Sequence, residues 1–463
     1  MAHLVIIGNG VTGITTARHV RKRSEMQITV ISAETEHFYS RPALMYIYMG
    51  HMRYQDTKPY EDWFWQKNRI DLIRSYVTAI DTDARTVQLE TGRSLAYDKL
   101  VIATGSQSNK FGWPGQDLPG VQGLYGMQDL ELMQRDTIGI NRAVIVGGGL
   151  IGVEMAEMLC SRKISVTFLV RGKFYWDTIL PEAEARLVSR HVRSHGVDLR
   201  LQTELKEILP GENGRVRAVV TNTGEEIACQ FVGLTAGVRP NIEVVKNSKI
   251  ASGKGVLINE YLETNIAGVY AAGDCAEITA TSAAEKNRIE QLWYTGRLQA
   301  MALAKTLGGE RTKYARGVWF NSAKFFDIEY QTYGVVSNEP RAGEKSFYWE
   351  QARGQQCLRI VYEEESGAVI GFNLFGIRFR HEVCDYWIRE KRTIDEVMEN
   401  LREANFDPEF FKTFEPEILA AYQRQNPNKR LQLKPRRNFF GQIFSKGFAH
   451  GASTNPATLG ARP

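Results

Sequence analysis

The N-terminal stretch of this 463-residue chain decides its fold: His3-Leu4-Val5-Ile6-Ile7 precedes Gly8-Asn9-Gly10-Val11-Thr12-Gly13. An apolar run that ends in this glycine pattern and continues into a helical segment predicts a strand, a tight turn and a helix. A second apolar run, residues 27–32, leads to Glu34, which lies 21 residues after Gly13. Such glycines let the backbone approach a pyrophosphate at the helix N-terminus, and such an acid accepts hydrogen bonds from ribose hydroxyls. The alternative is an ordinary glycine turn, and the flanking strands and the acid argue against it.

The same pattern occurs a second time in the chain. Apolar residues 142–146 precede Gly147-Gly148-Gly149-Leu150-Ile151-Gly152, and Glu154 follows two residues into the predicted helix. The first glycines of the two patterns are 139 residues apart, so the whole strand-turn-helix unit is an internal repeat. The next predicted strand, 165–170, is followed by Arg171 and Lys173 instead of an acid.

Composition places the chain among ordinary globular proteins. Hydrophobic residues make up 43%, and the length predicts about three domains. We expect no secretory signal peptide, since the first core strand begins at residue 3 or 4, and no apolar run of about 18 residues predicts a membrane span. The five cysteines are scattered without a CxxC pair, which favours reduced thiols and a cytoplasmic location.

The net charge of +5 comes from the C-terminal segment. Residues 426–463 contain seven Lys and Arg and no acid, so the rest of the chain has 51 basic and 53 acidic residues. This balance gives no support to a nucleic-acid-binding protein. We expect the segment to be a disordered, solvated tail. In the alternative, residues 438–448, where aromatic and basic residues interleave, become helical and dock on an anionic membrane or a partner.

Four motifs in a fixed order indicate a family. The two glycine patterns, the Ala103-Thr104-Gly105 turn and the Tyr270-Ala271-Ala272-Gly273-Asp274 block resemble the FAD-dependent pyridine nucleotide-disulfide oxidoreductase superfamily over about residues 3–300. Within it the chain is most similar to the rubredoxin, ferredoxin and nitrite reductase-type flavoproteins. The resemblance implies an α/β fold with two Rossmann-like domains and a C-terminal α+β interface domain. The expected segments are 1–111 with 246–317 for FAD, 112–245 for NAD(P)H, 318–425 for the interface domain and 426–463 for the basic tail.

The resemblance implies an FAD site in the first repeat. Glu34 would bind the adenosine ribose, and the backbone of Val77 would contact the adenine. Asp274 would bind the ribityl chain, although a helix N-cap is the alternative. Trp293 would begin a helix that faces the flavin pyrimidine, although a core residue is the alternative. The remaining expected FAD-binding residues are Gly8, Gly10, Val11, Thr12, Gly13, Arg41, Pro42, Ala103, Thr104, Gly105 and Gly273.

The resemblance implies an NAD(P)H site in the second repeat. Glu154 would lie near the nicotinamide, unless it is an exposed helix acid. Arg171 and Lys173 would suit a 2′-phosphate, which favours NADPH over NADH, unless they form a solvated basic turn. The remaining expected residues are Gly147, Gly149, Leu150, Ile151, Gly152 and Gly237.

The redox centre differs from the disulfide-reducing branch. Pro42 stands where single-cysteine members carry their thiol, and no cysteine precedes Cys160, which argues against reduction of disulfides or peroxides through such a thiol. Tyr46 stands where electron-transfer relatives often have lysine, so Arg41 is the candidate neighbour of flavin N5. We expect no metal, because His381 and Cys384 form at most half a site.

The inferred function is hydride transfer from NADPH or NADH to flavin N5, with Arg41 and Glu154 as the catalytic candidates. The expected acceptor is a small electron-transfer protein of the ferredoxin or rubredoxin kind. The alternatives are an NAD(P)H oxidase or quinone reductase and a non-catalytic, flavin-binding redox sensor or docking subunit. A homodimer stays open, and no motif encodes the acceptor.

Overall fold

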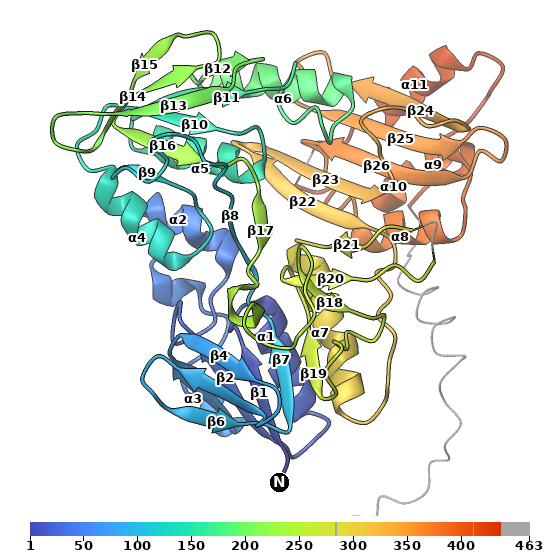
Figure 1. The fold of residues 1–463 in the computed structure, drawn as a ribbon. Coiled ribbons are helices and arrows are strands. Elements are labelled where there is room, and N and C mark those ends of the chain that lie inside the picture. The colour runs from blue at the N-terminus through green and yellow to red at the C-terminus, as the bar shows by residue number, and fades with distance from the viewer. Residues whose placement is uncertain (283–284, 411, 437–463) are drawn as a thin grey trace, which may run out of the picture. The chain divides into compact units, whose positions relative to one another are not determined.

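The computed structural model describes residues 1–282, 285–410 and 412–436 (Figure 1). Its contacts group the chain into two units. Residues 1–328 and 337–339 form the first unit, and the second consists of 329–336 and the residues from 340 onward.

The first repeat forms a five-stranded parallel sheet with the order β19-β7-β1-β2-β3. Its strands are β1 (His3–Ile7), β2 (Gln27–Ser32), β3 (Ile70–Arg74), β7 (Lys99–Ile102) and β19 (Val269–Ala271). The central strands are apolar and buried, as expected for a parallel sheet covered on both faces. Because β19 joins the sheet from far along the chain, the sheet combines residues from before 111 and after 246.

The second repeat forms another five-stranded parallel sheet, with the order β12-β11-β10-β16-β9. Its strands are β9 (Val121–Gln122), β10 (Arg142–Val146), β11 (Ser165–Val170), β12 (Asp198–Leu201) and β16 (Phe231–Leu234). In both sheets the strand before the glycine turn is central, and the next strand along the sequence lies beside it. The expected α/β architecture with two Rossmann-like sheets is therefore confirmed.

Helices follow the glycine turns in both repeats. After β1 comes α1 (Val11–Arg21), which contacts α7 (Trp293–Leu307), and after β10 comes α5 (Leu150–Ser161). The other helical segments of this unit are η1 (Arg41–Ala43), α2 (Leu44–Tyr48), η2 (Tyr54–Thr57), α3 (Trp63–Lys67), α4 (Met127–Asp136), α6 (Glu182–Ser194) and η3 (Glu243–Val245).

Shorter strands connect the two repeats. The segment after β7 forms β8 (Ser106–Ser108), which pairs antiparallel with β17 (Val238–Pro240), the segment after β16. The segment 106–123 thus contains two strands, β8 and β9. The remaining strands of the unit are β4 (Val77–Asp81), β5 (Thr86–Leu89), β6 (Ser94–Ala96), β13 (Leu205–Pro210), β14 (Val216–Thr221), β15 (Glu226–Ala228), β18 (Val256–Ile258), β20 (Ala276–Ile278), β21 (Arg288–Ile289) and β22 (Phe320–Phe325).

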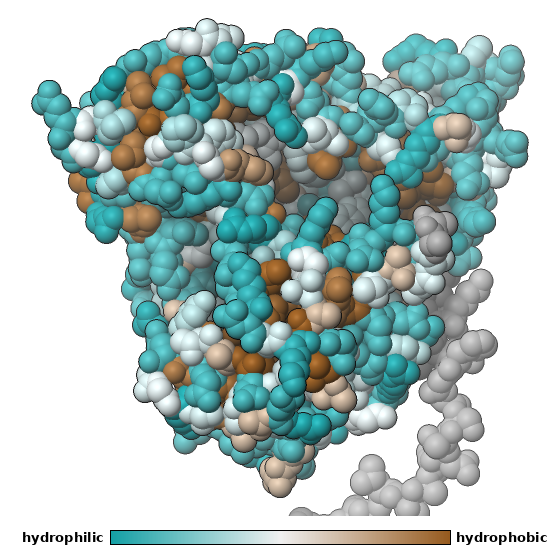
Figure 2. All heavy atoms as spheres, in the orientation of Figure 1, coloured by the Kyte–Doolittle hydropathy of each residue, from teal (hydrophilic) through white to brown (hydrophobic). Residues whose placement is uncertain are grey.

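The surface of the first unit is mostly polar on the face seen in Figure 2. Hydrophilic residues cover most of it, and hydrophobic residues show near β18, β20 and α7. In the part of the chain that the structure describes, no helix has the length and apolar character needed to cross a bilayer.

The second unit has an antiparallel sheet with the order β23-β26-β25-β24. Residues 364–366 form the turn between two of these strands. The helical stretch 380–404 is divided, because Thr393 makes a capping box with Glu396 and starts a new helix there. The elements are β23 (Ile328–Gly334), β24 (Glu344–Glu350), β25 (Cys357–Glu363), β26 (Val369–Phe375), α8 (His381–Arg389), α9 (Ile394–Glu399), α10 (Leu401–Ala404) and α11 (Glu415–Gln425).

The first residues of the basic tail are held by ion pairs. Lys429 Nζ lies 2.7 Å from Asp395 Oδ1, and Lys434 pairs with Glu399. Residues 426–436 therefore contact α9, which differs from the expected disorder. The segment 438–448, proposed from the sequence as a docking helix, lies outside the described residues.

Candidate functional site

The turn after β1 allows two close backbone approaches. Gly8 has φ +113°, and a Cβ on it would overlap the carbonyl oxygen of Ala103. A Cβ on Gly13 would overlap the carbonyl oxygen of Gly8. At Gly10, by contrast, no described atom lies within 4 Å of the place that a Cβ would take. Gly10 is also the N-cap of α1 and has no side chain to cap it, so the first N–H groups of α1 are available to an anion.

The turn after β10 repeats this arrangement. Gly147 has φ +114°, and a Cβ on it would lie 2.7 Å from Thr235 O. A Cβ on Gly152 would lie 2.6 Å from Phe168 Cζ and 2.7 Å from Gly147 O. Gly149, the N-cap of α5, again has open space where a Cβ would be, as far as the described atoms show. Both turns thus have the cradle that a pyrophosphate needs.

A cavity of about 960 Å³ joins the two repeats. Both Ile151 and Glu154 line it from the second repeat. The predicted residues that line it from the first repeat are Gly8, Gly10, Val11, Thr12, Glu34, Arg41, Pro42, Val77, Ala103, Thr104, Gly105, Asp274 and Trp293. Other predicted residues lie outside its lining: Gly13, Gly147, Gly149, Leu150, Gly152, Arg171, Lys173, Gly237 and Gly273.

Glu34 occupies the end of β2 and is already hydrogen-bonded. Its Oε1 accepts from Met127 N at 2.8 Å, from Arg41 Nη1 at 3.0 Å and from the Tyr39 hydroxyl. Its Oε2 accepts from Arg41 Nη2 at 2.7 Å. Although burial acts in the opposite direction, the Arg41 guanidinium holds the pKa of Glu34 below its usual value. A second lone pair of Oε2 is left for a ribose hydroxyl.

The side chain of Arg41 contacts Glu34 and two neighbouring tyrosines, Tyr39 and Tyr125. It also donates to the carbonyl oxygen of Tyr125 and lies over that ring, 4.5 Å from the centroid. This position pairs the Arg41 guanidinium with Glu34, and the predicted role beside flavin N5 stays a prediction. Neither Tyr39 nor Tyr125 was identified from the sequence, since no motif marks them.

Asp274 lies at the opposite end of the same hydrogen-bond network. Its Oδ2 accepts from Ser106 Oγ at 3.0 Å and from Tyr125 Oη at 3.2 Å. Burial raises the pKa of its carboxyl group. A strand, β20, follows Asp274, so the helix N-cap alternative does not apply. The carboxylate lines the cavity, where it can accept hydrogen bonds from hydroxyl groups.

Trp293 is the first residue of α7 and lies at the cavity wall. Its exposed fraction of 36% argues against the alternative of a core tryptophan. The N-cap residue is Leu292, whose side chain cannot accept a hydrogen bond. The positive end of the α7 dipole can therefore stabilise negative charge on a bound ring.

Glu154 is half-buried in the first turns of α5 and lines the cavity. Burial, strengthened by the charge of Glu157, raises the pKa of Glu154 to about 7, and Lys324 opposes the rise. The alternative of an exposed helix acid therefore does not apply. Near neutral pH this carboxyl group can both hold and release a proton.

Lys324 of β22 supplies the cation near this acid. Its Nζ lies 2.7 Å from Glu157 Oε1 and 5.4 Å from the centroid of Tyr46. A lysine from a distant strand thus packs on Tyr46, at the position where the resemblance led us to expect a lysine. Sequence reasoning missed Lys324 because nothing in the stretch around it marks a site.

Arg171 and Lys173 lie on an exposed turn after β11. An acid shares that turn, because Asp177 packs against Gly172 and accepts from Phe174 N at 3.2 Å. The turn therefore offers two cations for a 2′-phosphate and one carboxylate for a 2′-hydroxyl.

The cysteines take no part in this site. All five belong to the described residues, and none lines the cavity. Cys275 is buried, with Sγ 3.4 Å from Ile102 O, and burial raises the pKa of its thiol. For His381 and Cys384, no third metal-ligating side chain gathers around them among the described residues.

Comparisons with known proteins agree with this geometry. The family model of the pyridine nucleotide-disulphide oxidoreductases matches residues 2–300. The chain is 30% identical over 312 residues to the benzene 1,2-dioxygenase system ferredoxin–NAD(+) reductase subunit of Pseudomonas putida, which covers 66% of this chain and 75% of that protein. It is 27% identical over 396 residues to the assimilatory nitrate reductase electron transfer subunit of Bacillus subtilis (strain 168).

The last match covers 84% of this chain and 49% of the relative. For two of the curated relatives the match covers 34% and 49% of the relative, so the chain spans about a third to a half of their length. Among solved structures, an NAD-dependent persulfide reductase from A. fulgidus is similar with a TM-score of 0.79 and 25% identity, over 92% of this chain and 83% of that one. The chain belongs to the pyridine nucleotide-disulphide oxidoreductase family.

Proposed function

We propose that the chain is an FAD-dependent NAD(P)H oxidoreductase that passes electrons to a small electron-transfer protein. The observation that carries this proposal is the single cavity in which the glycine turn of the first repeat meets Glu154 of the second. A dinucleotide held by the first repeat would have its reactive ring beside the residues of the second. Bound FAD would accept a hydride from NAD(P)H and later release the electrons.

The residues of the first repeat fit FAD along its length. The N-terminus of α1 would bind the pyrophosphate, and Arg41 would add a cation close by. Oxygens of Glu34 and Asp274 would accept hydrogen bonds from the ribose and the ribityl chain. The N-terminus of α7, at Trp293, would stabilise negative charge at the flavin end.

The residues of the second repeat would position the nicotinamide. The turn at Gly147–Gly152 would bind its pyrophosphate, and Arg171 and Lys173 would select NADPH, with NADH as the alternative that Asp177 favours. As a carboxylate, Glu154 would favour the positive charge that the nicotinamide ring gains when it gives up a hydride. Lys324 would pair with Glu157, and its positive charge would favour the ionised form of Glu154.

Relatives indicate the class of acceptor. The Pseudomonas putida protein is named as a ferredoxin–NAD(+) reductase subunit and the Bacillus subtilis protein as an electron transfer subunit. We therefore place a ferredoxin- or rubredoxin-type protein before a quinone or dioxygen as acceptor. A homodimer, a tail contact with membranes and a cytoplasmic location stay predictions.

Turnover with defined acceptors tests the proposal. The purified protein should reduce a ferredoxin or rubredoxin with NAD(P)H faster than it reduces a quinone or dioxygen. A protein that binds FAD but transfers electrons to none of these would support the redox sensor instead.

A further inference from the structure

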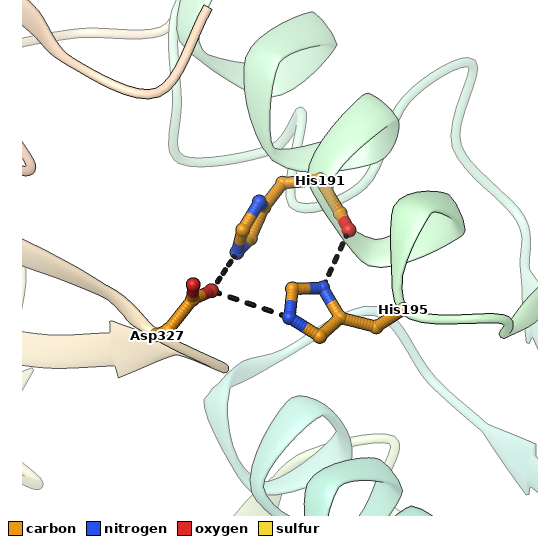
Figure 3. Close-up of side chains that lie close together, drawn as sticks. All are labelled: His191, His195 and Asp327. Carbon is orange, nitrogen blue, oxygen red and sulfur yellow. Dashed lines mark hydrogen bonds and ion pairs between the residues drawn. The ribbon is translucent and has the colours of Figure 1, made fainter.

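Three side chains gather away from the flavin cavity. His191 and His195 project from the C-terminal end of α6, and Asp327 lies in the turn between β22 and β23 (Figure 3). The Nε2 atoms of the two histidines lie 2.7 and 3.2 Å from the same oxygen, Oδ1 of Asp327. The three potential ligand atoms are within 4.8 Å of one another, and none of the three residues lines the cavity, as far as the described chain shows.

The helix sets the spacing of the two rings. Residues four apart lie on the same face of a helix, so both imidazoles point toward the β22–β23 turn. The His195 ring is held on both sides, because Nδ1 lies 3.0 Å from His191 O and the ring stacks on Phe326, with centroids 4.3 Å apart. A carbonyl oxygen can only accept, so Nδ1 carries the proton. In neutral His195 the Nε2 lone pair then faces Asp327.

An ordinary ion pair does not satisfy this arrangement. The side chain of His191 is only 5% exposed, and its Nε2 makes no well-directed hydrogen bond with any described group although a carboxylate oxygen is 2.7 Å away. Two imidazole nitrogens and a carboxylate oxygen therefore converge on one point, where one cation could contact all three.

We propose that His191, His195 and Asp327 bind a divalent transition metal ion of the zinc class. Two imidazoles and one carboxylate are typical ligands of Zn²⁺, with bonds of about 2.0–2.2 Å. The hydrogen bond from His195 Nδ1 to a carbonyl is the kind of outer contact that orients such a ligand. His195 is 31% and Asp327 68% exposed, so water completes the coordination.

The metal has a structural role in this position. It joins α6 to the turn that follows β22, three residues after Lys324. Fixing that turn also fixes the strand from which Lys324 reaches Glu157. Metal binding at this site does not depend on the function proposed above, and the test below does not use activity.

Cobalt and zinc binding to the full-length, flavin-loaded protein tests the site. The protein is produced without a histidine tag, treated with a chelator and titrated with Co²⁺, whose visible bands report coordination, and then with Zn²⁺ as competitor. The wild type should bind one Co²⁺ per chain, and Zn²⁺ should displace it. We expect His195→Gln and Asp327→Asn each to weaken binding at least about tenfold, since each removes a ligand.

The matched control is His19→Gln, a histidine on α1 outside the cluster, which should bind Co²⁺ as the wild type does. Flavin absorbance and thermal melting check that the variants are folded. Equal binding by the wild type and the His195→Gln/Asp327→Asn double variant would overturn the proposal.

X-ray absorption of the Zn²⁺-loaded wild type gives a measurement that needs no variant. Two imidazole nitrogens together with oxygen ligands support the site. A sulfur-containing shell, or a shell without imidazole, contradicts it.

Discussion

The two glycine turns of the first unit have similar backbone conformations but different neighbouring side chains. In both, the first glycine has φ near +113° and the third lets the helix lie against the turn. The strand after the first turn leads to Glu34, which is half-buried and paired with Arg41. The strand after the second leads to the exposed Arg171. The backbone sets the capacity to bind a pyrophosphate, and the side chains beyond it choose the dinucleotide.

The turns also differ in their relation to the cavity. The first turn lines it directly, whereas the second turn, Gly147–Gly152, contributes only Ile151 among the described lining residues. This difference is the one expected if the first turn holds FAD tightly and the second turn binds a nicotinamide cofactor that enters and leaves. The predictions below test this contrast, starting with the largest effect.

Adding a methyl group to the third glycine should affect the two repeats unequally. In Gly13→Ala the new Cβ would lie 1.9 Å from the Gly8 carbonyl oxygen, whereas in Gly152→Ala it would lie farther from its nearest neighbours, 2.6 Å from Phe168 Cζ and 2.7 Å from the Gly147 carbonyl oxygen. We expect Gly13→Ala to lose most of its bound FAD or to fail to fold. Gly152→Ala should keep its FAD and raise the KM for NAD(P)H at least about tenfold.

Flavin-to-protein ratios and steady-state kinetics check this pair. Gly211→Ala is the control, because its new Cβ would have no described neighbour closer than 3.3 Å. Equal loss of FAD in both repeat variants would show that the turns do not have separate ligands.

Removing the acid of the first repeat should destabilise the protein. Glu34→Ala leaves the Arg41 guanidinium without its carboxylate, at a cost of about 2 kcal/mol in the free energy of unfolding. Because the folded-state pKa of Glu34 lies below its unfolded value, its contribution is present above the unfolded pKa, about 4.3. It is lost as pH falls through the folded-state pKa.

Denaturant unfolding of the wild type and the variant, at pH 7 and at pH 3, measures this difference. The gap in stability should shrink at the lower pH. A gap that is constant between the two pH values would contradict the ion pair as its source.

Reversing the charges of Arg171 and Lys173 in the second repeat should change the preference between NADPH and NADH. We expect the Arg171→Glu/Lys173→Glu variant to lose about tenfold in kcat/KM for NADPH relative to NADH, since a 2′-phosphate loses its cations. Asp177→Asn should shift the ratio the other way, by a smaller factor. Kinetics with both cofactors measure the ratios, and an unchanged NADPH/NADH ratio in both variants would remove this turn from cofactor selection.

The smallest expected effect is a shift in pH dependence. The pKa of Glu154 is raised to about 7, and Lys324 restrains the rise. If the carboxylate is the active form, flavin reduction should accelerate as pH rises through about 7. The Lys324→Met variant should move this inflection to higher pH, because the pKa rises further without the cation.

Rapid-mixing rates between pH 5.5 and about pH 9 measure the inflection. Lys313→Met, which removes an exposed lysine paired with Glu260, is the control and should leave it in place. A shift to lower pH in Lys324→Met would contradict the assigned direction.

Much of the fold could be predicted from the sequence because glycine patterns report backbone constraints. Positions such as Gly8 and Gly147 admit no other residue, so the strand-turn-helix units and their repetition are visible in one chain. The parallel sheets follow from the same pattern. The division of residues 380–404 into shorter helices depends on the local cap at Thr393, which was overlooked.

The side chains brought together from distant segments could not be predicted in this way. Lys324 reaches Glu157, and Asp327 reaches His191, only after the chain has folded, and no spacing rule connects them. The direction of Arg41 is a similar case, since no sequence pattern indicates that its guanidinium pairs with Glu34. A sequence pattern identifies residues that act through the backbone better than residues that act through tertiary contacts.

The central claim is that both repeats serve one reaction in the shared cavity. Anaerobic stopped-flow reduction of the FAD-loaded protein, with NADPH and NADH separately, tests it most directly when wild type and Glu154→Gln are compared. The account predicts fast loss of flavin absorbance with at least one cofactor in the wild type and slower loss in the variant at pH 8. If neither cofactor reduces the wild-type flavin, the second repeat does not deliver a hydride donor to the first, and the account is wrong.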